Sequence, residues 1–177
     1  MGCCSSKSAH SKPSGQEGQR LEENQGQVEF HESPIHDIST LLPVELLQDK
    51  VGNTASLDDL KGKVIGLYFS ARWCPPCKGF TPKLAEFYNA LQSESKNFEV
   101  VFISSDRTKE EFNNYFEEMP WLALPFDSRP KKDELSKKFG VVGIPTLVLL
   151  DETGKEITRN GRQKIMEDPK GKGFPWQ

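Results

Sequence analysis

Apolar runs and turn signals divide the chain, from about residue 41 onward, into alternating strands and helices. Residues 64–69 and 98–103 are apolar runs of the kind found in strands that are buried on both faces. Between them, apolar side chains recur every three or four positions from Phe80 to Leu91, which predicts a helix with one apolar face. This order of strand, helix and strand favours a parallel strand pair in an α/β domain.

Shorter signals predict the elements that precede the first long strand. Residues 41–47 are expected to open the core as a short helix followed by a strand, and Gly52-Asn53 indicates a hairpin turn. Residues 56–60 have the pattern of one capped helical turn. The chain therefore enters its core well before residue 64.

The segment after residue 103 predicts two further helices. Ser105-Asp106 is expected to cap a helix that runs to Met119. A shorter helix is expected over residues 133–139, because Gly140 directly after it can take the backbone conformation that ends a helix.

The C-terminal part predicts a hairpin and a last helix. Residues 147–150 and 156–158 are expected to form two strands joined by a turn. Together with the parallel pair they predict a central mixed β-sheet with helices on both faces. Beyond them, residues 166–176 either pack on the domain through Phe174 and Trp176 or form a free end, and the sequence does not choose between these.

The beginning of the chain has a different composition. Ser, Gln, Glu, Gly and Lys dominate residues 5–32, so this segment cannot bury enough apolar surface to offset the entropy lost on ordering. We therefore predict a flexible, disordered N-terminal tail over residues 1–38 and one folded domain over residues 39–177.

The tail begins with the pattern of N-terminal acylation. Gly2 follows the initiator Met and a serine stands at position six, which favours myristoylation of Gly2. One myristoyl chain gives only marginal, reversible membrane binding, so a second signal is needed. Cys3 and Cys4 supply palmitoylation sites beside it. The alternative is an ordinary polar tail that happens to begin with Met-Gly.

Composition and charge narrow the classes of protein. A net charge of −3 argues against nucleic acid as the main partner, and no apolar stretch is long enough to cross a bilayer or to form a secretory signal. We expect a cytosolic monomer, held at a membrane by the acylated tail, with the nucleus as an open alternative. The four cysteines and three histidines do not supply four ligands close together, so no metal site is expected.

Two cysteines carry the candidate chemistry. Cys74 and Cys77 stand three residues apart, where the strand at residues 64–69 leads into the next helix. At a helix start, unpaired backbone N–H groups and the helix dipole favour negative charge, and such a setting lowers the pKa of a thiol such as that of Cys74. Cys77 is close enough to form a small disulfide and to release a bound partner. The motif therefore predicts thiol–disulfide exchange.

Five stretches, in this order, resemble the tryparedoxin and nucleoredoxin-type members of the thioredoxin superfamily. They are residues 68–82, 98–102 and 119–126, then Gly143-Ile144-Pro145-Thr146, and finally Phe174-Pro175-Trp176. The resemblance covers about three quarters of the chain and implies the thioredoxin fold.

The resemblance also implies roles around the motif. Cys74 would be the attacking thiolate and Cys77 the resolving thiol. Trp73 would cover the cysteine pair and shape access to it, and the spacer Pro75-Pro76 would tune the reduction potential.

Two more positions follow from the same resemblance. Pro145 would be a cis proline that faces the disulfide, and the backbone of Ile144 would pair with a partner strand. Tyr68 is a departure, because thioredoxin carries a buried Asp there that helps to move protons for the resolving thiol. The sequence does not indicate which residue would take over that role.

Two functions of different classes are consistent with these residues. The first is a protein-disulfide reductase without a bound cofactor, which an upstream donor re-reduces: a flavin reductase, glutathione or a glutathione conjugate. The second is a redox-sensitive adaptor of the nucleoredoxin type, in which the cysteine pair acts as a switch within a signalling complex.

Overall fold

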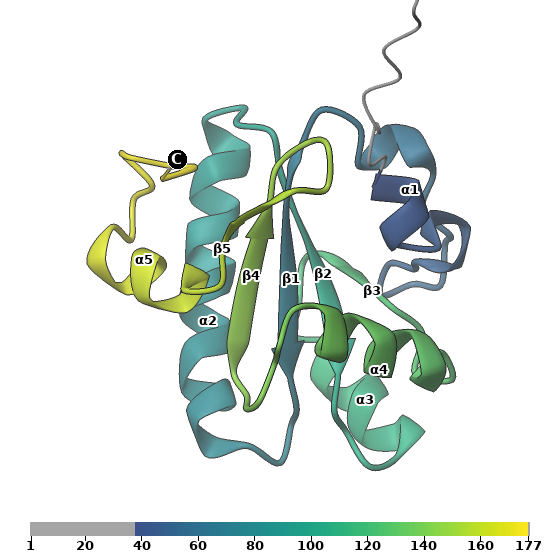
Figure 1. Cartoon of the computed structure of the whole chain (residues 1–177). Helices are drawn as coiled ribbons and strands as arrows, with labels where there is room; N and C mark the ends of the chain where they lie inside the picture. The colour runs from purple at the N-terminus through teal and green to yellow at the C-terminus, as the bar shows by residue number, and fades with distance from the viewer. Residues whose placement is uncertain (1–37, 177) are drawn as a thin grey trace, which may run out of the picture. The chain divides into compact units, whose positions relative to one another are not determined.

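The computed structural model describes residues 38–176 (Figure 1). Within this part, five α-helices and two short 3-10 turns surround one five-stranded sheet. The predictions for Gly2, Cys3 and Cys4 lie outside the described residues. The boundary placed between residues 38 and 39 stays a prediction.

The sheet is mixed, with the strand order β3-β2-β1-β4-β5. β1 pairs in parallel with β2 and antiparallel with β4, while β3 and β5 form the edges. The expected thioredoxin fold, with its parallel pair and its returning hairpin, is therefore confirmed. The strands are β1 (Val64–Ser70), β2 (Phe98–Ser104), β3 (Leu122–Ala123), β4 (Thr146–Leu150) and β5 (Glu156–Thr158).

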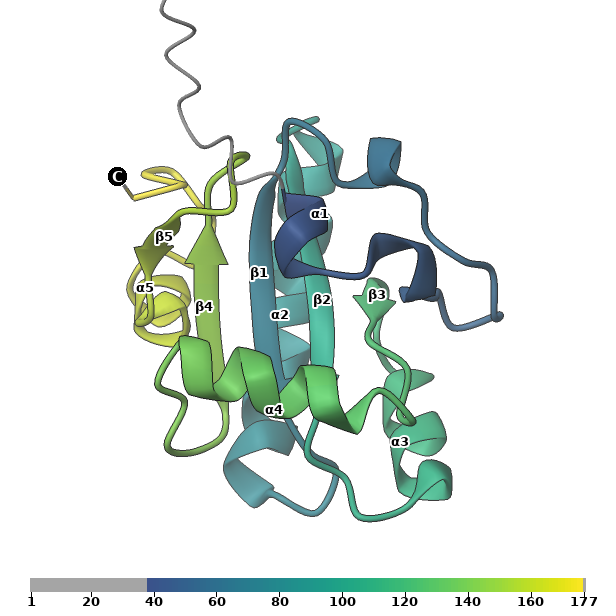
Figure 2. The same cartoon turned by 45° about the vertical axis from the view of Figure 1, so that its right-hand side comes forward.

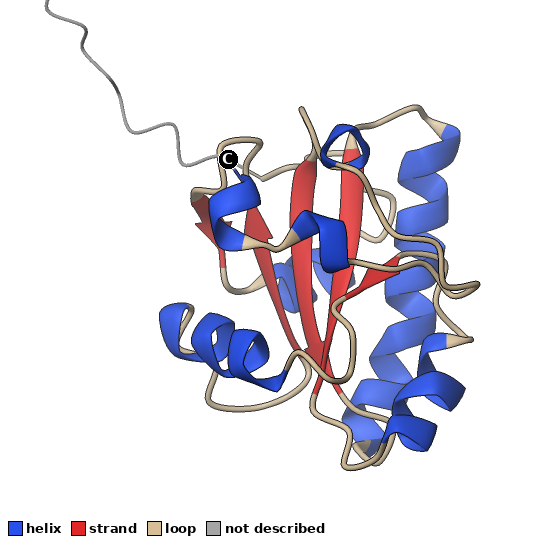
Figure 3. Cartoon of the chain, turned by 90° about the vertical axis from the view of Figure 1, so that its right-hand side faces the viewer, coloured by secondary structure: helices blue, strands red, loops and turns tan. Residues whose placement is uncertain are grey.

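Helices cover both faces of the sheet. α2, α3 and α5 pack on one face, and α1 and α4 pack on the other, as Figures 2 and 3 show. The sheet is thereby shielded from water on both sides, as its two long apolar strands require. The helices are α1 (Ile38–Leu41), α2 (Pro75–Ser93), α3 (Lys109–Phe116), α4 (Arg129–Lys138) and α5 (Gly161–Glu167).

Alternating side chains of the central strands feed two separate apolar clusters. Tyr68 and Phe102 point to the face of α2 and α3, whereas Leu67 and Phe69 point to the face of α1 and α4. On the first face α5 lies directly against β4, and a Cβ atom at Gly161 would come within 2.8 Å of a backbone oxygen there. Only glycine permits this close approach.

The start of α3 corrects the sequence prediction. The helix begins at Lys109 and its cap is Thr108, whose hydroxyl accepts the backbone N–H of Glu111 at 3.1 Å. The predicted cap, Ser105-Asp106, does not cap the helix. The Asp106 carboxylate instead accepts the backbone N–H of Arg72. The helix also ends earlier than expected, at Phe116 rather than Met119.

Other boundaries differ as well. The expected strand within residues 41–47 is a 3-10 turn, Val44–Leu46, followed by a single bridge between Gln48 and Thr54 around the predicted turn. α4 begins at Arg129, four residues before the predicted start, and ends before Gly140 as expected. The capped turn is confirmed over Leu57–Asp59.

The C-terminal segment is packed, so the first of its two alternatives is correct. The Trp176 ring stacks on Phe87 with their centroids 5.5 Å apart, and Phe174 meets Phe98 edge-on at 5.1 Å. The indole N–H of Trp176 donates to the Asp168 carboxylate at 3.0 Å. The segment thus closes the core over the C-terminal half of α2.

We expect Trp176→Ala to lower the free energy of unfolding by about 2 kcal/mol, because the variant loses a partly buried aromatic stack and its packing area. Urea denaturation measures this. Met166→Ala is the matched control, since Met166 lies in the same C-terminal region and is half exposed. Equal midpoints for the two variants would contradict the packed arrangement.

Candidate active site

The cysteine motif lies where β1 ends and α2 begins. Cys74 is the N-cap residue of α2, with extended backbone angles of φ −96° and ψ 109°. Pro75 and Pro76 are the first residues of the helix, where the fixed φ of proline favours a helix start and no N–H is required. The sequence of the motif therefore sets the point at which the helix begins.

Cys74 and Cys77 form a disulfide, with their Cα atoms 5.2 Å apart. That separation lies within the usual range for such a bond. The two residues differ in access: Cys74 is 5% exposed, whereas Cys77 is completely buried. A partner can therefore approach only the first cysteine.

The first turn of α2 offers the Cys74 sulfur fewer hydrogen-bond donors than the sequence predicts. Pro75 and Pro76 have no backbone N–H, and the N–H groups of Cys77 and Lys78 both donate to the Cys74 carbonyl, at 3.0 and 3.1 Å. No unpaired N–H of this turn is left for the Cys74 sulfur. What remains to favour a thiolate is the helix dipole.

Trp73 is held by the loop that joins β2 to α3. Its indole N–H donates to the Ser105 carbonyl at 3.1 Å, and the Arg107 guanidinium lies 5.0 Å from the ring centroid, within cation–π range. The side chain remains 44% exposed beside the motif. It therefore presents a fixed apolar surface to an approaching partner.

Ile144 and Pro145, just before β4, lie beside Cys74. Their peptide bond is cis, and the Ile144 carbonyl oxygen lies 3.8 Å from the Cys74 sulfur. Ile144 packs on the small cluster that contains Ala71 and both cysteines. The structure thus brings together residues that are 70 positions apart in the chain.

Asp106 is a residue of the site that the sequence analysis misassigned. Its carboxylate accepts the backbone N–H of Arg72 at 2.7 Å and the Ser104 hydroxyl at 2.7 Å. Burial raises the pKa of this carboxyl, against the lowering effect of its hydrogen bonds. The available signal was its position just past the end of β2, beside the end of β1. Asp106 therefore anchors the segment that leads to Cys74.

Tyr68, the departure from thioredoxin, belongs to a group of buried hydroxyls behind Cys77. Its phenol contacts the hydroxyls of Thr81 and Ser70, and the Thr81 hydroxyl donates to the Cys77 carbonyl at 3.0 Å. Burial raises the pKa of the Tyr68 phenol, so this group is protonated at neutral pH. A neutral phenol therefore stands where thioredoxin would carry a buried carboxylate.

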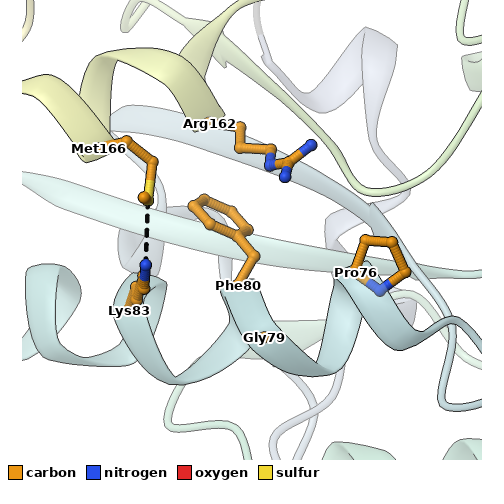
Figure 4. A pocket seen from close by; sticks show the side chains of 6 residues that line it. All are labelled: Pro76, Gly79, Phe80, Lys83, Arg162 and Met166. Atoms are coloured by element: carbon orange, nitrogen blue, oxygen red, sulfur yellow. Dashed lines mark hydrogen bonds between the residues drawn. The ribbon is translucent and has the colours of Figure 1, made fainter.

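A shallow pocket of about 270 Å³ opens beside the motif (Figure 4). The Arg162 guanidinium lies 5.9 Å from the centroid of the Phe80 ring, and the Lys83 ammonium lies 3.6 Å from the Met166 sulfur. The side chains that line the pocket include two cations, Lys83 and Arg162, and no carboxylate. They are Pro76, Gly79, Phe80, Lys83, Arg162 and Met166.

Residues 38–176 contain neither a metal-binding cluster nor a membrane-spanning helix. No group of three or more side chains with metal-ligand chemistry comes together there. No helix in that part of the chain has both the length and the apolar character to cross a membrane.

Comparison with known proteins assigns the family. The thioredoxin-like family model matches residues 62–156. The chain belongs to the thioredoxin-like family. Tryparedoxin from Trypanosoma brucei brucei is 54% identical over 122 residues, which is 68% of this chain and 84% of the relative. Human nucleoredoxin is 43% identical over 125 residues, or 71% of this chain, but these cover only 29% of that relative.

Solved structures agree with this thioredoxin-like assignment. Tryparedoxin from Trypanosoma brucei superimposes with a TM-score of 0.73 at 50% identity, over 78% of this chain and 96% of that structure. Tryparedoxin I from Crithidia fasciculata gives 0.74 at 45% identity, over 79% and 97%. With its cysteine pair in place, this thioredoxin-like chain is an enzyme of the dithiol oxidoreductase class.

In the reduced protein, we expect the pKa of Cys74 to lie below the ordinary value of a free cysteine, because its sulfur lies at the positive end of a 19-residue helix. Ultraviolet thiolate absorbance against pH measures it in a Cys77→Ser variant, with Cys3 and Cys4 also replaced by serine. The further variant Cys74→Ser gives the baseline. A midpoint equal to that of a free thiol would show that the dipole does not act on this sulfur.

Proposed function

We propose that this protein reduces disulfides of partner proteins through Cys74 and Cys77. The observation that carries the proposal is the unequal access of the two cysteines: Cys74 reaches the surface and Cys77 is wholly buried. A partner sulfur can meet only the first, while the second lies where it can attack only the bond that the first has made.

The reaction takes two exchange steps. The Cys74 thiolate attacks the partner disulfide, forms a mixed disulfide and expels one partner thiolate, which takes up a proton. Cys77 then loses its proton and attacks the Cys74 sulfur, so that the Cys74–Cys77 bond forms and the second partner thiolate leaves. Two electrons have passed from the cysteine pair to the partner.

The surroundings of Cys74 support an extended polypeptide as the partner. Ile144 precedes β4 and its backbone lies beside the Cys74 sulfur, where a partner strand would find main-chain groups. Val142 just before it is fully exposed, and Trp73 is half exposed beside the motif. Both are exposed apolar side chains that a partner strand would contact.

For the electron donor we propose a small thiol or a flavoprotein, with a glutathione conjugate as the favoured class. A related structure is described as tryparedoxin II complexed with glutathionylspermidine. In this chain, Lys83 and Arg162 beside the motif would pair with the carboxylates of a glutathione moiety. Their charges support the donor class without defining one compound.

A Cys77→Ser variant is expected to accumulate mixed disulfides with its substrates, because the second step is blocked. Partners from cells under oxidising conditions would be isolated on the full chain and identified by mass spectrometry after reduction. The double variant Cys74→Ser/Cys77→Ser is the control. If the single variant retains no more partners than the double variant, the reductase mechanism is wrong.

The alternative function, a redox-sensitive adaptor, rests on the likeness to nucleoredoxin. It differs from a reductase because it does not reduce disulfides catalytically. An adaptor would hold one partner in one redox state, so reduction of insulin by dithiothreitol would proceed at the same rate with the unmodified chain and with Cys74→Ser. A reductase accelerates this reaction only when Cys74 is present. We favour the reductase, because the likeness to nucleoredoxin covers less than a third of that protein.

We also propose that the protein is cytosolic and tethered to a membrane by myristate on Gly2 and palmitate on Cys3 or Cys4. The supporting pattern is in the sequence alone. Such a tether would restrict the reductase to partners at one membrane surface.

Gly2→Ala is expected to move the protein from the membrane fraction of cells to the soluble fraction, because the first acyl chain cannot then be attached. Cys3→Ser/Cys4→Ser should weaken membrane association in the same direction, since one chain binds only marginally. Ser8→Ala is the control. Membrane recovery of Gly2→Ala equal to that of the control would refute the tether.

A further inference from the structure

Four buried hydroxyl groups lie in a ring of contacts behind the resolving cysteine. Tyr68 contacts Thr81 at 2.8 Å, Thr81 contacts Tyr115, and Ser70 contacts both Tyr115 and Tyr68 at 3.1 Å. All four side chains are at most 2% exposed. They come from β1, α2 and α3, so the ring joins three elements at the point where the motif is attached.

Thr81 is the hub of this ring, as a count of protons shows. The Cys77 carbonyl can only accept, so its 3.0 Å contact with Thr81 uses the Thr81 proton. The Thr81 oxygen is then free to accept from both phenols, Tyr68 and Tyr115, while Ser70 donates to Tyr68. The four protons thus serve four of the five contacts, and the contact between Ser70 and Tyr115 is left without one. Three of the four hydroxyls therefore depend on one threonine oxygen, directly or through one neighbour.

The contact to Cys77 occurs where α2 is weakened. Pro82 lies inside the helix and has no N–H to donate to the carbonyl four residues earlier. The first turn, which carries Cys77, therefore has one fewer backbone bond to the rest of the helix. The Thr81 hydroxyl adds a bond to the Cys77 carbonyl and, through Tyr68, links that turn to β1.

We propose that this hydroxyl ring positions Cys77 for the resolving step, with Thr81 as the principal positioning residue. The inference rests on the proposed reductase function and deepens it. Once the disulfide is open, no covalent bond holds the Cys77 sulfur beside that of Cys74. The rate of resolution then depends on how closely the backbone keeps the two sulfurs together, and a misplacement of about 1 Å can cost a factor of about 100.

The ring fits this role better than a role in carrying charge. Its members are hydroxyls, and Tyr68 and Tyr115 can each donate a hydrogen bond to the Thr81 oxygen. On the other side of the motif, the Asp106 carboxylate holds the backbone of Arg72. The segment from residue 72 to residue 77 is thus anchored at both ends, before Cys74 and at Cys77.

The test separates the two exchange steps. The reduced full chain, with Cys3 and Cys4 replaced by serine in every variant, is mixed with excess dithiobis(nitrobenzoate), an aromatic disulfide. Attack by Cys74 releases the first coloured nitrothiobenzoate, and resolution by Cys77 releases the second. Stopped-flow absorbance at limiting protein concentration follows both phases, and the dependence on reagent concentration assigns them, because only the first step is bimolecular.

Thr81→Val should leave the first phase unchanged and slow the second roughly tenfold, because the buried turn loses its hydroxyl bond without a large change in volume. Thr81→Ser should restore the second phase, since it returns the hydroxyl. If Thr81→Val does not fold, Tyr68→Phe/Tyr115→Phe keeps both rings and removes two members of the network. It should slow the second phase in the same direction.

Tyr88→Phe is the matched control, because it also removes a buried phenol, one that donates to Glu99 outside the ring. Equal second-phase rates for Thr81→Val and the unmodified chain, or an equal slowing in Tyr88→Phe, would overturn the inference. Failure of the proposed function gives a different result: the unmodified chain itself would release no second equivalent. The two failures are therefore distinguishable.

Discussion

The antiparallel pairing of β1 with β4 is the constraint on which the site depends. Its register sets Phe69 opposite Thr146, so the last residues of β1 and the first residues of β4 lie side by side at one end of the strands. The chain leaves β1 into the cysteine motif and enters β4 from Ile144 and Pro145. A slip of one residue would turn every side chain of one strand to the other face and expose apolar groups, so the core enforces the register that the site requires.

Two different polar anchors then hold the motif against this sheet. Before Cys74, a carboxylate at Asp106 binds the backbone of Arg72. Behind Cys77, neutral hydroxyls linked through Thr81 bind its carbonyl. The first anchor is a buried carboxylate, 4% exposed, whose oxygens accept hydrogen bonds from the Arg72 N–H and the Ser104 hydroxyl. The second lies in the aromatic core, where an isolated charge would be costly, and it is built from hydroxyls. Both anchors therefore bind the backbone of the motif from buried positions, the first through a hydrogen-bonded carboxylate and the second through hydroxyls.

Much of the fold could be predicted from the sequence, because the long elements have strong signals. The apolar runs of β1 and β2 and the apolar face of α2 need no tertiary information. The start of α3 could not be predicted in the same way. Asp106 and Thr108 are both good cap residues, and the choice between them is made by the N–H of Arg72, which is distant in sequence and takes the carboxylate. The packed C-terminal segment likewise depends on aromatic partners in α2 and β2.

The site itself was predictable as a motif but not as an electrostatic environment. The pattern of two cysteines at a helix start suggests donation of N–H groups to the sulfur, yet both available groups, on Cys77 and Lys78, are taken by the carbonyl of Cys74. A helix dipole at a partly buried terminus is worth at most about 2 kcal/mol, which corresponds to a factor of about 30 in the ionisation of a thiol. A larger effect would require those two N–H groups to exchange the carbonyl for the sulfur when the disulfide opens. Pro75 and Pro76 have no N–H, so only the N–H groups of Cys77 and Lys78 can turn toward the sulfur. They belong to the turn that the Thr81 hydroxyl binds through the Cys77 carbonyl.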